Sequence, residues 1–322
     1  MAFPVPKRAR IYEVGPRDGL QNEAAFLATE DKARLIELLA AAGLPAIEIT
    51  SFVNPRWIPP LADAENLAAL LRDRPELPRL TALVPNEKGL ERALANGLRE
   101  VAVFMSASES HNKRNINKTR AEAYEAFVPI FDRCRAADVS VRAYVSTVWG
   151  CPYEGRVAPE AVLETALRLL DLGAYEISLG DTIGIGTPGQ TADLLGFLFE
   201  HVAAERLALH MHDTRGTALA NCLVGLQMGI TTFDASVGGL GGCPYAPGAS
   251  GNLATEDLVY MLDGLGVETG VSLDRLVAAG LFAQELLGRP LPGRALRALA
   301  SSCTTPIPRP HFESHNSSQV IV

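Results

Sequence analysis

The hydrophobic pattern of this 322-residue chain alternates between short apolar runs and longer stretches with helical periodicity. Eight short runs, rich in aliphatic residues, predict buried strands. They cover Arg10–Val14, Ala46–Thr50, Leu80–Val84, Glu100–Phe104, Val139–Ser146, Tyr175–Leu179, Arg206–His210 and Thr232–Val237.

The stretches between these runs predict amphipathic helices. They cover Thr29–Ala42, Leu61–Leu71, Asn86–Asn96, Thr119–Ala137, Pro159–Leu172, Thr187–Ala203 and Thr217–Met228. Several of them begin at proline or at a capping side chain, and several end at a glycine, as helix boundaries usually do. The terminating glycines are Gly43, Gly97, Gly173 and Gly229.

Strict alternation of strand and helix predicts a parallel sheet. Eight repeats at this chain length favour closure into a (β/α)8 TIM barrel, with a doubly wound open sheet as the alternative. Further helices are expected at Thr255–Gly264, Ser272–Leu287 and Arg294–Ala300. We therefore expect a catalytic barrel over residues 1–264, followed by a short C-terminal helical extension with a flexible tail over residues 265–322.

Composition and charge narrow the functional class. Hydrophobic residues make up 48% of the chain and charged residues 20%, which is typical of a globular protein with a large core. The net charge of −8, without a dense basic cluster, argues against nucleic acid and membrane as partners. The five cysteines are scattered and form no CxxC pair, so we expect reduced thiols and a cytoplasmic location.

Two histidines, His210 and His212, lie at the end of the seventh predicted strand. Residues two apart on a strand point to the same side, so both imidazoles are expected to enter one cavity. A single histidine in such a strand is more often a hydrogen-bonded core residue. Here two of only six histidines occur together and are followed by Asp213, which favours a metal site.

Asp18 follows the first predicted strand, and the loops after barrel strands converge on one face. On its own, an aspartate before a glycine is more often a turn residue. A carboxylate, the imidazoles of His210 and His212, and an amide oxygen together suit a six-coordinate Mg²⁺ or Mn²⁺ ion better than a closed tetrahedral zinc site. Zinc is kept as an alternative.

A glycine-rich segment, Gly238–Gly242, precedes Cys243 and Pro244. Four glycines among five residues permit mobility and close backbone approach to a ligand, as a lid requires. A free cysteine is usually a small core residue. Its glycine and proline neighbours make core packing of Cys243 unfavourable, so a reactive role is the better interpretation. Asn252 could cap the next helix or supply a carbonyl ligand to a metal.

Taken together, these segments resemble the hydroxymethylglutaryl-CoA lyase family, within the superfamily of metal-dependent α/β-barrel lyases and condensing enzymes. The resemblance extends from Arg10 to about Leu262. It is carried by Glu13–Glu23, Ile47–Val53, Ala143–Ser146, Gly150–Gly155, Ser178–Gly184, His210–Asp213, Gly239–Ala246 and Gly248–Asp257.

The resemblance implies a role for each matching residue. It implies that the metal ligands are Asp18, His210, His212 and Asn252. It implies that Arg17 is the catalytic cation and that Cys243 is the acid–base residue on a mobile loop, whose glycines are Gly239, Gly241 and Gly242. Glu48 and Asp181 resemble supporting acidic residues, and the expected substrate-binding residues are Arg17, Gln21, Ser178 and Thr182.

The implied reaction is a divalent-metal-dependent retro-Claisen cleavage of 3-hydroxy-3-methylglutaryl-CoA to acetyl-CoA and acetoacetate. The implied setting is leucine catabolism and ketone-body formation by a homo-oligomer, expected to be a dimer. Ser110 and His111 stand where many relatives carry bulkier residues, which leaves the acyl chain of the CoA substrate open.

Three alternatives are kept. A lyase for a longer branched 3-hydroxyglutaryl-CoA would share all of these residues. A Claisen-condensing synthase would share the arginine–aspartate pair and the two histidines but would not explain the cysteine loop. A non-catalytic metal-binding barrel would be expected to lack Arg17, Cys243 or a ligand, and this chain has all of them.

Overall fold

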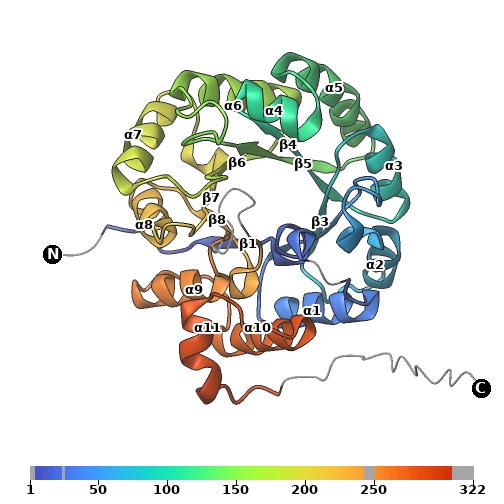
Figure 1. Cartoon of the computed structure of the whole chain (residues 1–322), viewed down its shortest axis with the longest axis vertical. Coiled ribbons are helices and arrows are strands. Elements are labelled where there is room, and N and C mark those ends of the chain that lie inside the picture. The colour runs from blue at the N-terminus through green and yellow to red at the C-terminus, as the bar shows by residue number, and fades with distance from the viewer. Residues whose placement is uncertain (1–3, 24–25, 243–250, 307–322) are drawn as a thin grey trace, which may run out of the picture.

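Eight parallel strands form a closed barrel in the computed structural model, which describes residues 4–23, 26–242 and 251–306 (Figure 1). Each strand pairs with its neighbours in the sequence, and β8 pairs with β1 to close the sheet. The strands are β1 (Arg10–Glu13), β2 (Ala46–Ser51), β3 (Arg79–Leu83), β4 (Glu100–Ser106), β5 (Ser140–Ser146), β6 (Glu176–Gly180), β7 (Leu207–His210) and β8 (Thr232–Ala235). The predicted TIM barrel is confirmed.

Helices surround the barrel as an outer ring (Figure 1). They are α1 (Thr29–Ala41), α2 (Ala64–Leu71), α3 (Glu87–Ala95), α4 (Glu109–Ile116), α5 (Arg120–Ala136), α6 (Pro159–Leu172), α7 (Pro188–Phe199), α8 (Ala218–Gln227), α9 (Thr255–Gly264), α10 (Leu273–Leu287) and α11 (Arg294–Leu299). The four predicted terminating glycines all have positive φ, between 84° and 117°, as a left-handed residue after a helix requires.

The helix α10 packs against both α1 and α9, so the outer ring continues beyond residue 264 (Figure 1). The domain boundary that we expect at residue 264 stays a prediction. Residues 307–322 of the predicted tail lie outside the described residues. Within the described ranges, no helix is both long and apolar enough to cross a membrane.

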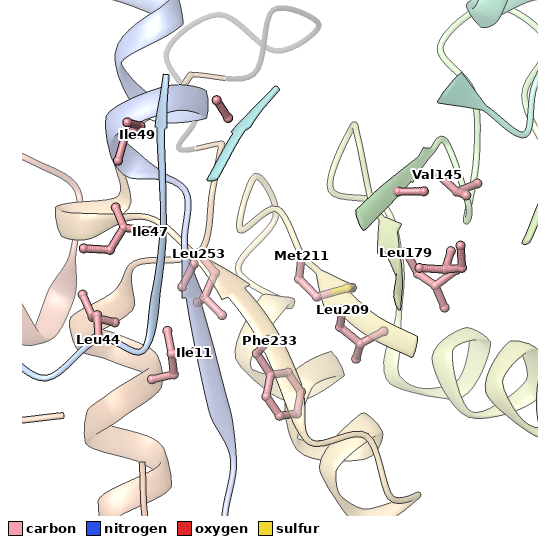
Figure 2. Packing of buried hydrophobic residues seen from close by; sticks show 14 of the residues in the cluster. Ile11, Leu44, Ile47, Ile49, Val145, Leu179, Leu209, Met211, Phe233 and Leu253 are labelled. Carbon is pink, nitrogen blue, oxygen red and sulfur yellow. The ribbon is translucent and has the colours of Figure 1, made fainter. Parts of the chain in front are cut away.

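The main apolar core lies between the barrel and its helices. Side chains alternate along each strand, so every second residue faces outward. Figure 2 shows outward-facing residues of this cluster, including Ile11, Ile47, Leu179, Leu209 and Phe233. Each of these five side chains has 0% exposure, and burying one such side chain contributes about 2 kcal/mol.

The inside of the barrel is largely polar. The residues that alternate with the apolar ones place Glu48, Arg142, Ser178, His210 and Asp234 inside it, all buried. Buried charges need partners to offset their lost hydration. Arg142 has 0% exposure and bonds Glu176 at 2.8 Å and Asp234 at 2.7 Å. Ion pairs therefore offset the lost hydration of the charged groups inside the barrel.

Among the elements that were not predicted, α4 and a turn at Gly15–Gly19 both contribute residues near the carboxyl ends of the strands. The helix α4 carries few apolar residues, so it lacks the periodicity that identifies a helix, and it begins at a Ser108 cap. The segment Gly15–Gly19 (η1) forms one turn of π-helix directly after β1. Such turns are frequent at functional sites, and η1 carries Arg17 and Asp18.

Candidate active site

A cavity of about 770 Å³ opens at the face where the carboxyl ends of the strands lie. Its size is that of a small-molecule site. Polar residues from loops after several strands line it, and an apolar side is formed by side chains of the following loops and of α5. The lining includes Arg17, Asp18, Gln21, Trp57, Ile58, Phe104, His111, Ile116, Phe127, Tyr144, Thr182, His210, His212 and Gly242.

The turn η1 sets the positions of Arg17 and Asp18. The carbonyl of Val14 accepts the backbone N–H groups of Arg17 at 3.1 Å and Asp18 at 2.7 Å. Gly19 lets this turn pack against the glycine-rich segment, because a Cβ at that position would lie 2.7 Å from the Cβ of Leu240. The first and last loops of the barrel therefore meet beside the cavity.

Arg17 is 6% exposed and is fixed on two sides. Its Nε and Nη2 donate to Oε2 of Glu48 at 2.9 and 2.8 Å, and its Nη1 pairs with Oδ1 of Asp18. The ring of Tyr144 lies 5.4 Å below the guanidinium. Burial lowers the pKa of Arg17, but Glu48 and Asp18 outweigh it and raise that pKa, so the cation is permanent.

Asp18, His210 and His212 come together as one cluster, as the sequence predicts. One ligand atom from each lies within 4.8 Å of the others. Burial raises the pKa of Asp18, but Arg17 and the two histidines outweigh it and lower the pKa to about 2. Burial, followed by the neighbouring His210, lowers the pKa of His212 to about 4. The resulting carboxylate and neutral imidazole are the forms that bind metals.

The fourth predicted ligand, Asn252, lies beside this cluster. β7 ends at His210 rather than at His212, and His212 is instead held by an antiparallel bridge to Asn252. The amide nitrogen of Asn252 donates to Oδ2 of Asp18 at 2.8 Å and to the carbonyl of Leu240 at 3.0 Å. Among the described residues no donor bonds its Oδ1, which can therefore accept a cation.

The donor set fits a divalent ion. Asp18, His210, His212 and Asn252 offer carboxylate, imidazole and amide donors, which together suit Mg²⁺, Mn²⁺ and related ions. The Nδ1 atom of His212 is buried and has no hydrogen-bond partner by geometric criteria among the described residues. A buried polar atom without a partner is costly, and a cation bound by this ring would reduce that cost.

The glycine-rich segment continues directly into this site. Gly239 and Gly241 have φ of 73° and 108°, and a Cβ at Gly241 would lie 2.5 Å from Nδ2 of Asn252. Only glycine allows that approach without displacing Asn252. Gly242 lines the cavity. Cys243 lies outside the described residues, so its predicted role stays a prediction.

The predicted substrate-binding residues divide into two groups. Arg17, Gln21 and Thr182 line the cavity. Ser178 does not: it has 0% exposure, and its hydroxyl donates to Oδ2 of Asp234 at 2.6 Å. The structure therefore places Ser178 inside the barrel, below the cavity, because it occupies the middle of β6 rather than the end.

The two predicted supporting acids have different surroundings. Glu48 holds Arg17 and accepts the Tyr144 hydroxyl at 2.8 Å. Asp181 accepts the backbone N–H groups of Ile185 at 3.0 Å and Gly186 at 2.8 Å, so its carboxylate stabilises the loop after β6. That loop carries Thr182 into the cavity. Asp181 therefore contacts its own loop rather than the cavity.

Sequence reasoning assigned no role to Tyr144 or Asp234. Tyr144 lines the cavity between Glu48 and Arg17, and its ring lies edge-on to His210 with centroids 5.9 Å apart. Asp234 bonds Nδ1 of His210 at 3.2 Å. The available signal was the position of Asp234 within an apolar strand, since a charged residue there must be buried and paired.

Two further carboxylates lie beneath the glycine-rich segment. Glu13 accepts the backbone N–H groups of Gly15 and Val237, both at 2.8 Å, and Glu256 accepts that of Gly238 at 2.7 Å. Burial raises the pKa of Glu13 to about 7 and that of Glu256 to about 8. These two groups join the end of β1 to α9 and to the start of the glycine-rich segment.

Glu256→Gln is expected to stabilise the protein at high pH. A carboxyl whose pKa is raised from 4.5 to about 8 stabilises the fold fully below pH 4.5 and loses this contribution as the pH rises towards 8. Glutamine carries no charge and keeps an acceptor for Gly238, so the variant should gain about 2 kcal/mol in free energy of unfolding near pH 9. Urea unfolding between pH 6 and 9 measures it. The exposed Glu268→Gln is the control, and equal pH slopes for wild type and Glu256→Gln would contradict the prediction.

Comparison with known proteins gives a consistent result. A family model described as HMGL-like matches residues 8–282. The hydroxymethylglutaryl-CoA lyase YngG of Bacillus subtilis is 52% identical over 300 residues, which cover 93% of this chain and 100% of that protein. A crystal structure of the B. subtilis HMG-CoA lyase has a TM-score of 0.90 at 51% identity, covering 92% and 99% of the two chains. An Acinetobacter baumannii HMG-CoA lyase in complex with coenzyme A and 3-methylmalate has a TM-score of 0.86 at 36% identity, covering 96% and 100%.

Proposed function

Because the chain belongs to the HMGL-like family, we propose that it is a carbon–carbon lyase that cleaves 3-hydroxy-3-methylglutaryl-CoA to acetyl-CoA and acetoacetate. The observation that carries this proposal is the convergence of a buried guanidinium, Arg17, with the Asp18–His210–His212 cluster in one cavity. Curated relatives at about 50% identity bear the same activity in their names, and the A. baumannii relative binds coenzyme A.

Asp18, His210, His212 and Asn252 would hold a divalent ion, with Mg²⁺ or Mn²⁺ as the proposed metal. When bound, such an ion acts as a Lewis acid that lowers the pKa of a hydroxyl group on the substrate. The tertiary hydroxyl of the substrate must lose its proton to a nearby base. The two candidate bases are Asp18, which has a second carboxylate oxygen, and His210, which can serve only while its free ring nitrogen does not bind the ion.

Arg17 stabilises the charge that develops during cleavage. As the bond between the two products breaks, its electron pair moves onto the thioester oxygen as an enolate. A cation that is already fixed in position by Glu48 and Asp18 stabilises this oxygen without reorganising. Arg17 stays charged throughout, because its neighbours raise its pKa.

Cleavage ends when the enolate carbon takes up a proton. We assign this step to Cys243 for two reasons. It follows a glycine-rich segment in the sequence, and the residue directly before it, Gly242, lines the cavity. A thiol carried by a loop that closes over the substrate can deliver a proton while excluding water.

Cys243→Ser is expected to lower kcat by roughly 10²-fold and to leave substrate and metal binding nearly intact, because only proton delivery needs the thiol. Serine fits the same space, but its much higher pKa makes it a poor acid. Steady-state kinetics measure the loss, and Cys303→Ser, which changes a partly buried thiol that does not line the cavity, is the control. Ordinary turnover by Cys243→Ser would assign the proton to another donor.

The acyl chain of the substrate is selected by the apolar side of the cavity. Ile116, Phe127 and Phe104 line this side, together with His111. A coupled assay for acetoacetate, run with Mg²⁺, with Mn²⁺ and with EDTA, tests the proposed substrate. Absence of turnover with any divalent ion would contradict the proposal, and turnover of longer homologues alone would establish the alternative lyase.

The proposal also includes the cellular location of the protein. Cys134, Cys151, Cys222 and Cys303 are free thiols, which supports a cytoplasmic location. A homodimeric state and roles in leucine catabolism and ketone-body formation stay predictions.

A further inference from the structure

Asp234 and His210 are direct neighbours across two barrel strands. The register of β7 and β8 pairs their Cα atoms, and both side chains point into the barrel. Nδ1 of His210 lies 3.2 Å from Oδ2 of Asp234, while Nε2 of His210 faces Oδ2 of Asp18 at 3.8 Å. The imidazole thus has one nitrogen on the barrel interior and the other on the cavity.

In the described part of the chain, Arg142 and Ser178 donate hydrogen bonds to Asp234 that favour its carboxylate form. Nη2 and Nη1 of Arg142 donate to its two oxygens at 2.7 and 3.1 Å, and the Ser178 hydroxyl donates to Oδ2 at 2.6 Å. Arg142 is itself fixed by Glu176 at 2.8 Å and lies 4.1 Å above the ring of Tyr12. This arrangement gives Asp234 a fixed position and a fixed charge.

An ionised carboxylate can only accept hydrogen bonds, so the ring nitrogen that faces Asp234 must carry the hydrogen. A neutral imidazole has one donor and one acceptor nitrogen. With the hydrogen on Nδ1, the lone pair must lie on Nε2, which faces Asp18 and the cavity. Either role of His210 in the proposed function, as metal ligand or as base, needs that lone pair, which serves one of them at a time.

We propose that Asp234 is a positioning residue that fixes His210 as the Nδ1–H tautomer and thereby directs its Nε2 lone pair into the cavity, where it can bind the metal. The inference rests on the proposed function, because that function requires His210 to bind a metal. Its test measures the tautomer and Mn²⁺ affinity and does not require the proposed substrate. Ser178 and Arg142 act with Asp234: Ser178 bonds the same oxygen that meets His210, and Arg142 holds the carboxylate ionised.

Asp234→Asn is the informative substitution. Asparagine has the same shape and can still accept a hydrogen bond, but its amide group can donate to Nδ1 of His210. That donation favours the opposite tautomer, in which Nε2 carries the hydrogen and cannot bind a cation. Changes of this kind beside a metal ligand lower metal affinity by about 10- to 100-fold.

The test uses the full chain labelled with ¹⁵N-histidine and freed of metal. Long-range ¹H–¹⁵N spectra at pH 8 report the tautomer of His210, assigned by comparison with His210→Gln. Wild type is expected to show the Nδ1–H form, and Asp234→Asn is expected to show more of the Nε2–H form. Titration with Mn²⁺, followed by calorimetry, is expected to show about 10- to 100-fold weaker binding for Asp234→Asn.

The matched control is Glu100→Gln. Glu100 is another buried carboxylate inside the barrel, where it accepts the hydroxyls of Tyr12 at 3.0 Å and Tyr175 at 2.7 Å, and it does not line the cavity. Its neutral isostere tests the general cost of changing an interior carboxylate, and it should leave the His210 tautomer and Mn²⁺ affinity unchanged.

Three results would overturn the inference. They are a wild-type His210 in the Nε2–H form, an Asp234→Asn protein with unchanged tautomer and Mn²⁺ affinity, and an equal loss of affinity in Glu100→Gln. The wild-type spectrum alone decides the first, even if Asp234→Asn does not fold. Since no thioester is present, a failure of the proposed substrate would be visible separately, as intact Mn²⁺ binding without turnover.

Discussion

Replacing Arg17 with lysine is expected to lower kcat by about 10³-fold, although the positive charge is retained. The guanidinium uses three nitrogens at once: Nε and Nη2 contact Glu48, and Nη1 contacts Asp18. An ammonium group is a compact point charge that cannot keep this arrangement and face an enolate oxygen in the same geometry. The developing charge would then lack its preorganised partner.

The measurement is steady-state turnover of 3-hydroxy-3-methylglutaryl-CoA, with thermal unfolding as the check on folding. Arg79→Lys is the matched control, because Arg79 also pairs with a carboxylate, Glu100 at 3.1 Å, but lies at the opposite end of the barrel at the start of β3. Near-normal kcat for Arg17→Lys would show that Arg17 does not stabilise the transition state.

Asp18→Asn is expected to abolish tight metal binding and to lower kcat by about 10³-fold. The carboxylate oxygens of Asp18 contact three side chains, those of Arg17, Gln21 and Asn252. Asparagine keeps the size of the side chain but removes the charge that a hard cation prefers in a ligand. Glu48 still pairs with Arg17 in this variant, so folding should be largely preserved.

Calorimetric titration with Mn²⁺ and turnover assays across a range of Mn²⁺ concentrations test this prediction together. If high Mn²⁺ restores part of the activity, Asp18 acts chiefly as a ligand. If Asp18→Asn bound Mn²⁺ as tightly as wild type, the assignment of Asp18 to the metal site would be wrong.

The barrel and much of its site could be predicted from sequence because strong local signals encode them. Aliphatic runs identify the strands, glycines identify helix ends, and the loops after parallel strands meet at one face. This reasoning places Asp18, His210 and His212 together, as the structure confirms. Only the rule for side-chain alternation and the geometry of barrels were needed.

The remaining features depend on exact position within the fold. Ser178 and Asp181 are both close in sequence to residues that line the cavity. Ser178 nevertheless lies inside the barrel, below the cavity, where it bonds Asp234. The carboxylate of Asp181 bonds the backbone of its own loop. The π-helical turn η1 packs through Gly19 against Leu240, a contact between residues far apart in the chain that a local sequence pattern does not encode. Pairings such as Asp234 with His210 depend on strand register, which a single sequence does not specify.

If Asp18, His210, His212 and Asn252 hold the proposed metal, the pairing of β8 with β1 limits when the protein can first bind it during synthesis. Asp18 follows the first strand, His212 follows the seventh, and Asn252 follows the eighth, so the cluster joins the two ends of the translated barrel. A nascent chain that has not yet emerged past Asn252 lacks the full ligand set, whatever its degree of helix formation. Contacts between such distant segments form slowly, because long loops must close first. Metal capture should therefore mark the completion of the barrel, and the ion would stabilise the closed ring over partly assembled chains.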